Sequence, residues 1–436
     1  MDSSSNQGSV LRRWRIFAGI CAFVAGSMAA AAPIAFVKGF TLTEIGDHRY
    51  DASLDMTFKT EAQLIVDRLF EIGVRHVNLS PRAVMTDPRQ SFIVPMTPDF
   101  DQATEKDRYL RLIQYIHGRG MTVGIRPIFF VVDASGNIPF VEPLPGGGEK
   151  VWWHGNIQPM DPAAWFSSFQ AYHDIYLAIA REARAEEYTI GAELQSMTVG
   201  IGAEWPTFPR GFPGQWLALL DHARTNLVAG TRVVYDINYT DAEVVTGAGI
   251  EYGAEIIVWR QRLVDEANPA DPELNQAWQN LMAFWKGLDA VGIDMYRSLA
   301  AETDVLPVVY EDLVKALRVN TDGFAAQLDE LLGLIAGVAG APKTAILKEL
   351  GYRSIERGFI DPFNYAGPGT LNIEHQAAAY DAVLASFAPG AYPWFAGAVF
   401  WDASVDMERH GPFDNGFSPI GKELTENVVR RYFGSP

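Results

Sequence analysis

Residues 187–196 read EYTIGAELQS, and residues 343–354 read KTAILKELGYRS. Each stretch is a short run of β-branched and apolar residues that ends in a glutamate, Glu193 or Glu349, and continues into a polar segment. Such runs are typical of strands that are buried on both faces, as in a parallel sheet. Both stretches therefore predict a buried strand that carries a carboxylate at its C-terminal end.

Similar strand-like runs recur along the chain, with helical patterns between them. The runs lie at 34–42, 74–80, 121–131, 188–195, 231–239, 288–298, 343–352 and 396–403. One helical pattern starts at Thr60, a residue suited to capping, and stops at Gly73, and another starts at Asp161-Pro162. Further helical patterns cover 104–118, 214–228, 273–286, 310–338, 373–387 and 420–433.

This alternation predicts an α/β fold, a (β/α)₈ TIM barrel. A doubly wound open sheet is the alternative, but no G-x-G-x-x-G follows the first strand and no Walker-type phosphate loop occurs. No repeat and no change in composition interrupts the chain after residue 33, so we expect one domain over residues 33–436. In such barrels the loops after the strands build the active site, and long ones are expected at 132–160, 196–213 and 404–419.

Residues 1–32 read as a signal peptide or a membrane anchor. Three arginines in residues 1–15 precede the run IFAGICAFVAGSMAAAA at 16–32, which ends in small residues. This pattern predicts a cleaved export signal, and the run is also about long enough to stay as an anchor. We therefore expect a periplasmic or secreted protein, either free or tethered to the membrane. The only cysteine, Cys21, lies in this segment, so the exported part has no thiol.

Composition excludes several function classes. The chain is 48% hydrophobic with a formal net charge of −18, and it has no cluster of Lys and Arg beyond the N-terminus, so we expect no nucleic-acid partner. The eight histidines form no H-x-x-H or H-E-x-x-H pattern, and we expect no metal and no other cofactor. No G-x-S-x-G occurs, so nothing indicates a serine hydrolase. The oligomeric state is left open.

The expected barrel places Glu193 and Glu349 at the same end of the fold. They would end the fourth and seventh strands, whose tips face each other across the barrel mouth. A single glutamate there is as readily part of a salt bridge at the rim. Two carboxylates about 5–5.5 Å apart are what retaining glycoside hydrolysis requires, one as nucleophile and one as acid/base.

An ordered set of motifs points to a family. Glutamates at the ends of strands 4 and 7 are the hallmark of clan A glycoside hydrolases, and within that clan the chain resembles glycoside hydrolase family 113, whose members are mainly β-mannanases. The resemblance covers nearly everything after residue 34. Its motifs, in chain order, are FVKGFTL, VWWHGNIQP, DPAAWFSSFQAY, IGAEL, VGIDMYR, LKELGYRS and AVFWDA.

The resemblance implies roles for five residues. Glu193 would be the acid/base and Glu349 the nucleophile. Tyr296 matches the clan tyrosine that donates a hydrogen bond to the nucleophile, and Trp401 matches the tryptophan that floors the −1 sugar. Arg82, just past the second strand, matches the clan arginine near the nucleophile.

Further candidates for substrate binding share a position at a strand end or in a long loop. They are Trp152, Trp153, His154, Asn238, Tyr239, Asp294 and Asp402, with Asp236 ending the same strand as Asn238. The acid/base role also predicts a higher pKa for Glu193 than for Glu349, because a neighbouring negative charge and burial favour the neutral acid.

One position departs from the clan pattern. Most members place Asn before the acid/base, where it contacts the sugar 2-hydroxyl, and this chain has Ala192. That contact strengthens in the transition state and contributes several kcal/mol. Three functions stay open: a retaining hydrolase of β-linked polysaccharide or oligosaccharide, first of the β-mannan type; a transglycosylase on the same glutamates; and a non-catalytic glycan-binding barrel. The partner in each is a carbohydrate.

Overall fold

The computed structural model describes residues 36–53, 58–97, 99–265, 270–365, 367–387 and 390–434. The signal or anchor expected at 1–32 lies outside the described residues, as does the start of the first expected strand. Within these ranges no helix is both long and apolar enough to cross a membrane. Export of the chain therefore stays a prediction.

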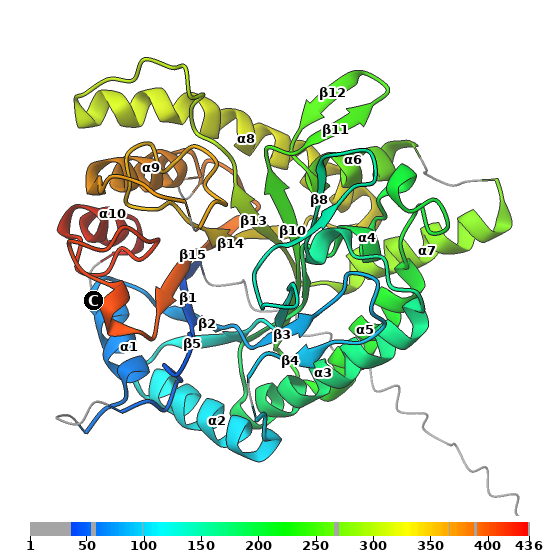
Figure 1. The fold of residues 1–436 in the computed structure, drawn as a ribbon, viewed down its shortest axis with the longest axis horizontal. Coiled ribbons are helices and arrows are strands. Elements are labelled where there is room, and N and C mark those ends of the chain that lie inside the picture. The colour runs from blue at the N-terminus through cyan, green and yellow to red at the C-terminus, as the bar shows by residue number, and fades with distance from the viewer. Residues whose placement is uncertain are drawn as a thin grey trace, which may run out of the picture. The chain divides into compact units, whose positions relative to one another are not determined.

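Eight parallel strands close into a barrel, which confirms the expected (β/α)₈ fold (Figure 1). They are β1 (Val37–Thr43), β2 (His76–Leu79), β5 (Thr122–Ile125), β9 (Glu187–Ala192), β10 (Arg232–Thr240), β13 (Ala290–Tyr296), β14 (Thr344–Leu350) and β15 (Phe395–Ser404). Around the ring each strand pairs with the strands before and after it in this order, and β15 closes onto β1.

A long helix follows each barrel strand. These helices are α1 (Glu61–Glu71), α2 (Gln102–Gly118), α3 (Pro162–Ala183), α5 (Pro213–Asn226), α7 (Pro272–Gly287), α8 (Tyr310–Ala339), α9 (Ile373–Ser386) and α10 (Glu423–Phe433). The start of α1 is fixed by a capping box, in which Thr60 accepts the Gln63 N–H and the Gln63 side chain accepts the Thr60 N–H. The Asp161 side chain caps α3 by accepting the Ala164 N–H, with Pro162 in the first turn of the helix.

The run at 121–131 is not one strand, as the sequence had indicated. It folds as β5, which belongs to the barrel, and β6 (Ile128–Val131), which pairs with β3 (Arg82–Met85) in a separate small sheet. Pro127 separates the two because proline has no N–H to donate to a strand ladder. Arg126 is therefore placed at the C-terminal tip of a barrel strand rather than inside one.

Both glutamate-bearing strands contain a register shift close to the glutamate. In β14, Ile293 of β13 pairs with Leu347 but the next residue, Asp294, pairs with Glu349, so Lys348 is an extra residue. A similar shift interrupts the pairing of β9 with β10 just before Ala192. Bulges re-aim side chains next to active sites. Here the one in β14 allows Lys348 and Glu349, although adjacent, both to be buried within the barrel.

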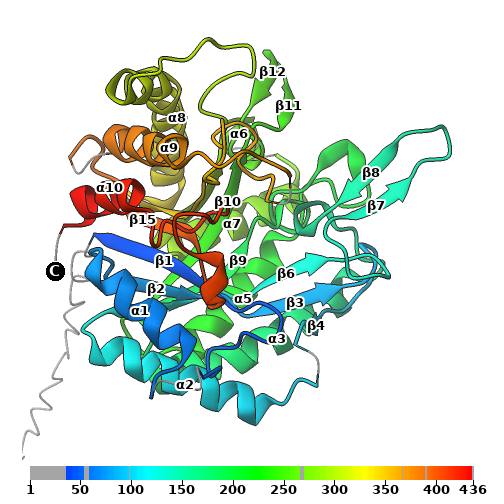
Figure 2. The ribbon, with the colours of Figure 1, turned by 60° about the vertical axis from the view of Figure 1, so that its left-hand side comes forward.

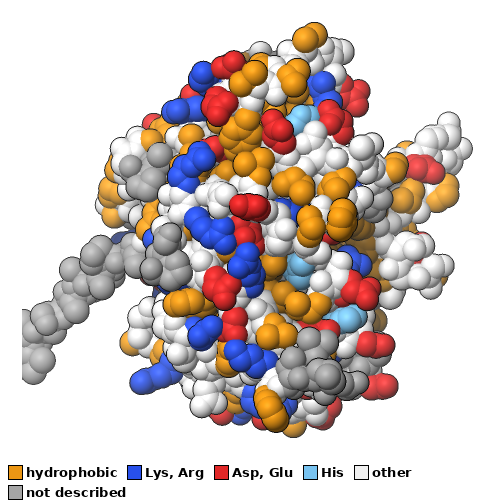
Figure 3. Space-filling model, turned by 90° about the vertical axis from the view of Figure 1, so that its left-hand side faces the viewer, with side chains coloured by type: hydrophobic (Ala, Val, Ile, Leu, Met, Phe, Trp, Pro, Cys, Tyr) orange, Lys and Arg blue, Asp and Glu red, His pale blue; other side chains and the backbone are white. Residues whose placement is uncertain are grey.

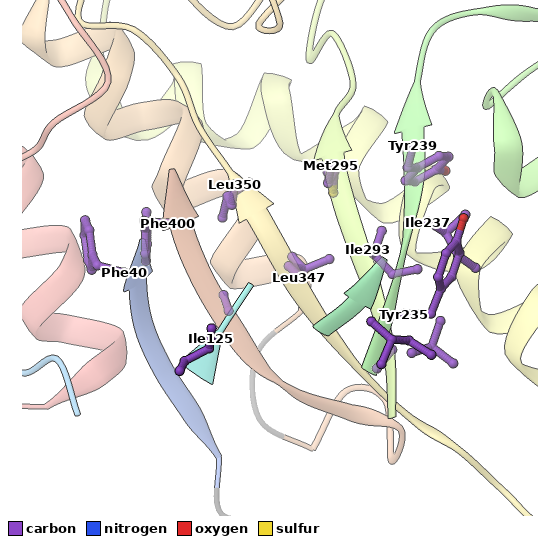
Figure 4. Close-up of a cluster of buried hydrophobic side chains, with 14 of the residues drawn as sticks. Phe40, Ile125, Tyr235, Ile237, Tyr239, Ile293, Met295, Leu347, Leu350 and Phe400 are labelled. Atoms are coloured by element: carbon purple, nitrogen blue, oxygen red, sulfur yellow. The ribbon is translucent and has the colours of Figure 1, made fainter. Parts of the chain in front are cut away.

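Apolar side chains of the barrel strands form the core that supports this end of the sheet (Figure 4). Phe40 of β1 and Phe400 of β15 stack with ring centroids 4.8 Å apart, across the seam where the barrel closes. The residues labelled in Figure 4 are Phe40, Ile125, Tyr235, Ile237, Tyr239, Ile293, Met295, Leu347, Leu350 and Phe400, all of them buried.

The additional elements all lie between a barrel strand and the helix that follows it, at the C-terminal end of the barrel. They are β3, β4 (Val94–Pro95) and β6, which form one sheet; the hairpins β7 (Phe140–Pro143)–β8 (Glu149–Trp152) and β11 (Glu243–Thr246)–β12 (Gly249–Tyr252); and the helices α4 (Gln195–Thr198) and α6 (Glu255–Asp265). Figure 2 shows both hairpins projecting from the body of the barrel. The chain has thus built up the end of the barrel at which such folds carry their active sites.

Candidate active site

Glu193 lies directly after β9, in a backbone conformation that is uncommon for a residue with a side chain. Its φ is 55°, in the left-handed region. The Glu193 N–H donates to the carbonyl of Asp236 at 2.9 Å, and the next N–H, of Leu194, donates to the Tyr235 hydroxyl at 3.1 Å. Two groups of β10, the Asp236 carbonyl and the Tyr235 hydroxyl, therefore hold this turn. They stabilise a backbone conformation that costs about 1–2 kcal/mol by itself.

The Glu193 carboxylate has a polar partner on each oxygen. Nε2 of His154 lies 2.9 Å from Oε2, and the Asn238 side-chain amide donates to Oε1 at 2.5 Å. His154 belongs to the inserted segment that follows β8, whereas Asn238 belongs to β10. The side chain is 12% exposed, so it is nearly enclosed but reaches solvent.

The Glu349 carboxylate is held by the barrel strands themselves. The Tyr296 hydroxyl, at the end of β13, donates to Oε2 at 2.6 Å, as expected from the sequence. Arg126 donates through Nη1 to Oε1, also at 2.6 Å. Each oxygen thus has one strong donor, and the side chain is 11% exposed.

Arg126 joins Glu349 to two further carboxylates. Its Nε donates to Asp236 at 2.7 Å and its Nη2 to Asp294 at 2.6 Å. The guanidinium is 1% exposed and both aspartates are fully buried. A planar fork of fixed geometry suits a cation that must serve three acids at once, which a lysine does not offer.

Four buried or nearly buried carboxylates, Glu193, Glu349, Asp236 and Asp294, thus lie around one guanidinium, and their pKa values respond. Burial raises the pKa of Glu349, and the charge of Glu193 adds to this against the opposing effects of Arg126 and Tyr296. Burial also raises the pKa of Asp294 well above its ordinary value, with the charges of Glu349 and Asp236 adding to it. Burial acts in the same direction on Glu193, but the hydrogen bond and charge of His154, with the Asn238 amide, bring its pKa below the ordinary value. The expected order, Glu193 above Glu349, is thus reversed in the protein without substrate.

A third glutamate lies behind Glu193. Glu255, in the first turn of α6, is fully buried and accepts hydrogen bonds from the Tyr235 hydroxyl at 3.2 Å, the Asn238 N–H at 3.1 Å and the indole N–H of Trp259 at 3.0 Å. Tyr235 and Asn238 are the residues that hold the Glu193 turn and its carboxylate. Burial without a cation raises the pKa of Glu255 to about 7.

Several residues expected from the sequence meet at the two carboxylates. His154 and Asn238 contact Glu193, and Tyr296 contacts Glu349. Trp153 is partly exposed, and its ring packs edge-on against His154 at 4.9 Å. Trp401 is also partly exposed and lies on β15, next to the strand of Glu349.

Two expected aromatic contacts are not at the site. Trp152 is buried, its indole N–H donates to Glu142, and the Lys150 ammonium lies 3.9 Å from its ring centroid. Its faces are used for packing within the hairpin, so it is no sugar platform. Tyr239 is fully buried, and its hydroxyl donates to Gln327 of α8 at 2.5 Å, behind the barrel wall.

Three other expected polar residues have protein partners of their own. The guanidinium next to Glu349 is that of Arg126, and Arg82 instead starts β3 with its guanidinium 5.7 Å from the centre of the Phe130 ring. Asp294 is fully buried beneath Arg126, so it supports the site rather than lining it. Asp402 accepts a hydrogen bond from Thr43 of β1 at 2.5 Å, and burial raises its pKa.

Sequence reasoning missed Arg126 and Glu255. Arg126 carries the same signal as the glutamates, a charged residue at the end of an apolar strand, but reading 121–131 as one strand concealed it. Glu255 had no such signal, because it lies in an inserted helix and its importance comes only from its contacts. The sequence indicated Asp236 as a residue at a strand end, but not as a hydrogen-bond acceptor of Arg126.

The site does not resemble a metal centre. In the part of the chain that the structure describes, no group of three or more His, Asp, Glu or Cys side chains could hold a metal ion. The face in Figure 3 shows Lys and Arg side chains interspersed with Asp and Glu. The chemistry available is that of two carboxylates and their hydrogen-bond donors.

No family model and no curated protein sequence matches the chain. Solved structures do match it. A GH113 β-mannanase from Alicyclobacillus acidocaldarius, in complex with ManMIm, has a TM-score of 0.60 at 19% identity and covers 93% of this chain and 99% of its own. Two structures of GH113 β-1,4-mannanase, one a complex, have TM-scores of 0.57 at 17% identity and cover 92% of this chain and 100% of theirs. The chain thus resembles GH113 β-mannanases in fold along nearly its whole length.

Proposed function

We propose that the protein is a retaining glycoside hydrolase that cleaves β-linked polysaccharide or oligosaccharide, with β-mannan as the first substrate to test. The observation that carries this proposal is the pair of nearly enclosed carboxylates, Glu193 and Glu349, at the ends of opposed barrel strands. Each carboxylate has its own set of donors, as two carboxylates with different tasks require. The likeness in fold to the GH113 β-mannanases supports the choice of substrate.

In the first step, Glu349 attacks the anomeric carbon while the bond from that carbon to the leaving sugar's oxygen breaks. Glu193 gives its proton to this oxygen. The product is a glycosyl ester on Glu349 and a free alcohol. Tyr296 and Arg126 orient the Glu349 carboxylate for attack, and both of its donors are in place before the sugar arrives.

In the second step Glu193, now ionised, takes a proton from water. The water oxygen attacks the anomeric carbon and releases Glu349. Two inversions give net retention of configuration. When a sugar hydroxyl takes the place of water, the same step is transglycosylation.

His154 lets Glu193 serve in both steps. An imidazole that carries a proton on Nε2 donates to the Glu193 carboxylate, and one whose only proton is on Nδ1 accepts a hydrogen bond at Nε2 from protonated Glu193. Protonation of Glu193 reverses the direction of its hydrogen bond with His154. The order of pKa values in the substrate-free protein, Glu193 below Glu349, can therefore change when substrate binds. Substrate then has only to favour that state.

Ala192 leaves the sugar 2-hydroxyl without the usual side-chain donor. Ala192 is the last residue of β9 and directly precedes Glu193. Since the 2-hydroxyl is axial in mannosides and equatorial in glucosides, this position bears on which sugar is preferred. We propose that discrimination at C2 is weaker here than in an enzyme with a donor at this position.

The test is a panel of β-1,4-linked manno-, gluco- and xylo-oligosaccharides, with products identified by mass and their anomeric form followed by NMR. We expect cleavage with retention, most readily of the manno series. An added acceptor sugar separates hydrolysis from transglycosylation. Binding without cleavage, unchanged in Glu193→Gln and Glu349→Gln, would instead mean a glycan-binding barrel.

We also propose that residues 1–32 direct export. The support is the arginine-preceded apolar run described above. Mass determination of the mature N-terminus and cell fractionation test it. A full-length cytoplasmic chain would contradict it.

A further inference from the structure

The barrel order places two of the inserted segments on opposite sides of the mouth. Three strands separate β5 from β14 in either direction around the ring. The segment between β5 and α3 therefore starts opposite the segment between β14 and α9. They can meet only if at least one of them reaches over the mouth or around its rim.

They do meet. The Tyr365 hydroxyl, between β14 and α9, donates to the carbonyl oxygen of Ile138, between β5 and α3, at 2.7 Å. In the same segment, Arg353 donates to the Gly367 carbonyl at 2.5 Å. The contact thus joins two loops whose strands have no contact with each other in the barrel ring.

The segments that meet also lead to the two carboxylates. Phe140 pairs with Trp152 at the base of the β7–β8 hairpin, so Ile138 lies two residues before the first strand and His154 two residues after the second. His154 contacts Glu193, at the end of β9. The base of one hairpin therefore reaches Glu193 on one side and the loop that follows the strand of Glu349 on the other.

The hairpin is also fixed to other loops. Arg89, between β2 and α2, pairs with Glu142 at 2.8 Å, and its guanidinium lies 4.8 Å from the Trp152 ring centroid. Lys150 pairs with Glu204, between β9 and α5, at 3.2 Å. Contacts to three other segments make the hairpin part of the framework of the mouth rather than a free arm.

We propose that this bridge, formed by the base of the β7–β8 hairpin and Tyr365, makes the barrel mouth a site that substrate enters by a chain end. The inference rests on the proposed function and specifies its substrate as the ends of β-linked chains. Cleavage of an interior bond requires the polymer to lie in a groove that is open on both sides of the scissile bond. A bridge from the Glu193 side to the Glu349 side closes that path, so a chain has to thread beneath it or stop against it.

The test compares two rates on one substrate, soluble β-1,4-mannan: release of reducing ends and loss of viscosity. We expect the wild type to release reducing ends with little early loss of viscosity and to give one short product from the start. Tyr365→Ala removes the bridging hydroxyl and ring. It should raise viscosity loss per reducing end by about fivefold, the change in an open–closed equilibrium that one lost hydrogen bond brings. Its rate on an aryl β-mannoside, which fits beneath the bridge, should stay unchanged.

A matched control is Tyr252→Ala on the other hairpin. Tyr252 is 49% exposed and Tyr365 54%, and the Tyr252 hydroxyl bonds only to Glu243 of its own hairpin among the described contacts. This variant should behave as the wild type. An immediate fall in viscosity with a broad mixture of products from the wild type overturns the bridge and leaves the hydrolase proposal intact. Equal ratios for Tyr365→Ala and wild type also overturn it. Failure of the wild type to cleave any β-linked substrate overturns the proposed function, and this inference with it.

Discussion

The two carboxylates of the site are almost equally enclosed, at 11% and 12% exposed, but they are held by different parts of the molecule. Glu349 lies within a barrel strand. Its donors are Tyr296, the last residue of a second barrel strand, and Arg126, the first residue after a third. Glu193 lies one residue beyond its strand, and one of its partners, His154, comes from an inserted segment. A carboxylate fixed by a cation and a phenol suits a nucleophile. A carboxylate beside an imidazole suits a group that changes its protonation state twice in each turnover.

This comparison also explains the bulges. A regular strand alternates its side chains between core and outer face, which would turn Lys348 and Glu349 in opposite directions. The extra residue in β14 brings both to the interior, where Lys348 pairs with Glu187 below the site and Glu349 faces the mouth. The barrel thus carries two layers of buried charge, one structural and one available to substrate.

The largest expected effect comes from removing the carboxylates themselves. Glu349→Ala should lower turnover on the order of 10⁵-fold, as loss of a nucleophile does. Azide should then enter the vacated space and give, from an activated aryl glycoside, an azide of inverted configuration. Glu193→Ala should cost on the order of 10²–10⁴-fold on a poor leaving group. With an activated leaving group and azide it should give the retained azide.

The products of the two variants, identified by NMR, therefore separate the two roles. Identical configurations from both would break the assignment of a strand-held nucleophile and a loop-held acid. Wild-type turnover in either variant would remove that glutamate from the mechanism.

The next effect concerns stability. Arg126→Met leaves Glu349, Asp236 and Asp294 buried without their shared cation, and removal of one partner from a buried ion pair costs about 3–5 kcal/mol. We expect a large loss in the free energy of unfolding measured with urea, or failure to fold. Arg126→Lys should fold better but lose activity, because an ammonium cannot reproduce three directed bonds.

His154→Ala is the matched change on the other carboxylate, since it removes the partner from Glu193. Its side chain is 19% exposed, and we expect under about 1 kcal/mol of change in stability. Equal losses from Arg126→Met and His154→Ala would show that the two carboxylates are not held differently after all.

The sequence predicted the site residues best where their position depends only on the order of the barrel strands. Glu193, Glu349 and Tyr296 end strands of an alternating pattern, and the barrel then brings those ends together. Tyr239 ends a strand too, but its side chain faces the helices, because alternation along β10 sends Asn238 inward and Tyr239 outward. Which of two neighbours faces the mouth depends on register, and the bulges shift register in ways that no local pattern signals.

Other features depend on contacts between distant segments. The Pro127 break is visible in the sequence, but Arg126 acquires its three partners only when β5, β10, β13 and β14 form one ring. Glu255 and the Ile138–Tyr365 contact join insertions, whose lengths are free to vary and whose paths the barrel pattern does not dictate.

A smaller effect should follow from Glu255→Gln. The new side-chain amide faces the donors of Tyr235, Asn238 and Trp259 with an N–H of its own. This loosens the turn at Glu193 and the Asn238 side chain that bonds to the Glu193 carboxylate. We expect kcat/KM to fall about 10-fold to 100-fold on an aryl glycoside with a poor leaving group. It should change little with a dinitrophenyl leaving group, which needs no proton. Equal losses on both substrates would mean a general structural defect.

Glu105→Gln is the control, since Glu105 of α2 is also a buried glutamate whose pKa is raised by burial, but it accepts hydrogen bonds from Tyr176 and Arg108 away from the site.

A second measurement on Glu255→Gln is the free energy of unfolding as a function of pH. The folded pKa of Glu255 is raised from 4.5 to about 7, so its contribution is present below pH 4.5 and is lost as pH rises through 7. Relative to Glu255→Gln, the wild type should lose on the order of 3 kcal/mol over that interval.

The smallest effect is a change in pH dependence alone, and it addresses the comparison most directly. His154 lowers the pKa of Glu193 through its hydrogen bond and its charge. His154→Ala should therefore raise that pKa, keep Glu193 protonated to higher pH in the substrate complex, and move the alkaline limb of kcat upward. Tyr296→Phe removes a donor that lowers the pKa of Glu349, and should move the acidic limb upward instead.

His117→Ala is the control, because His117 lowers the pKa of Glu186 by the same kind of contact at the opposite end of the barrel, and it should move neither limb. The measurement is kcat against pH at saturating concentration of an aryl β-mannoside with a poor leaving group, because kcat reports the substrate complex. An alkaline limb that stays in place in His154→Ala would show that Glu193 is not the acid, or that the inserted segment does not control it.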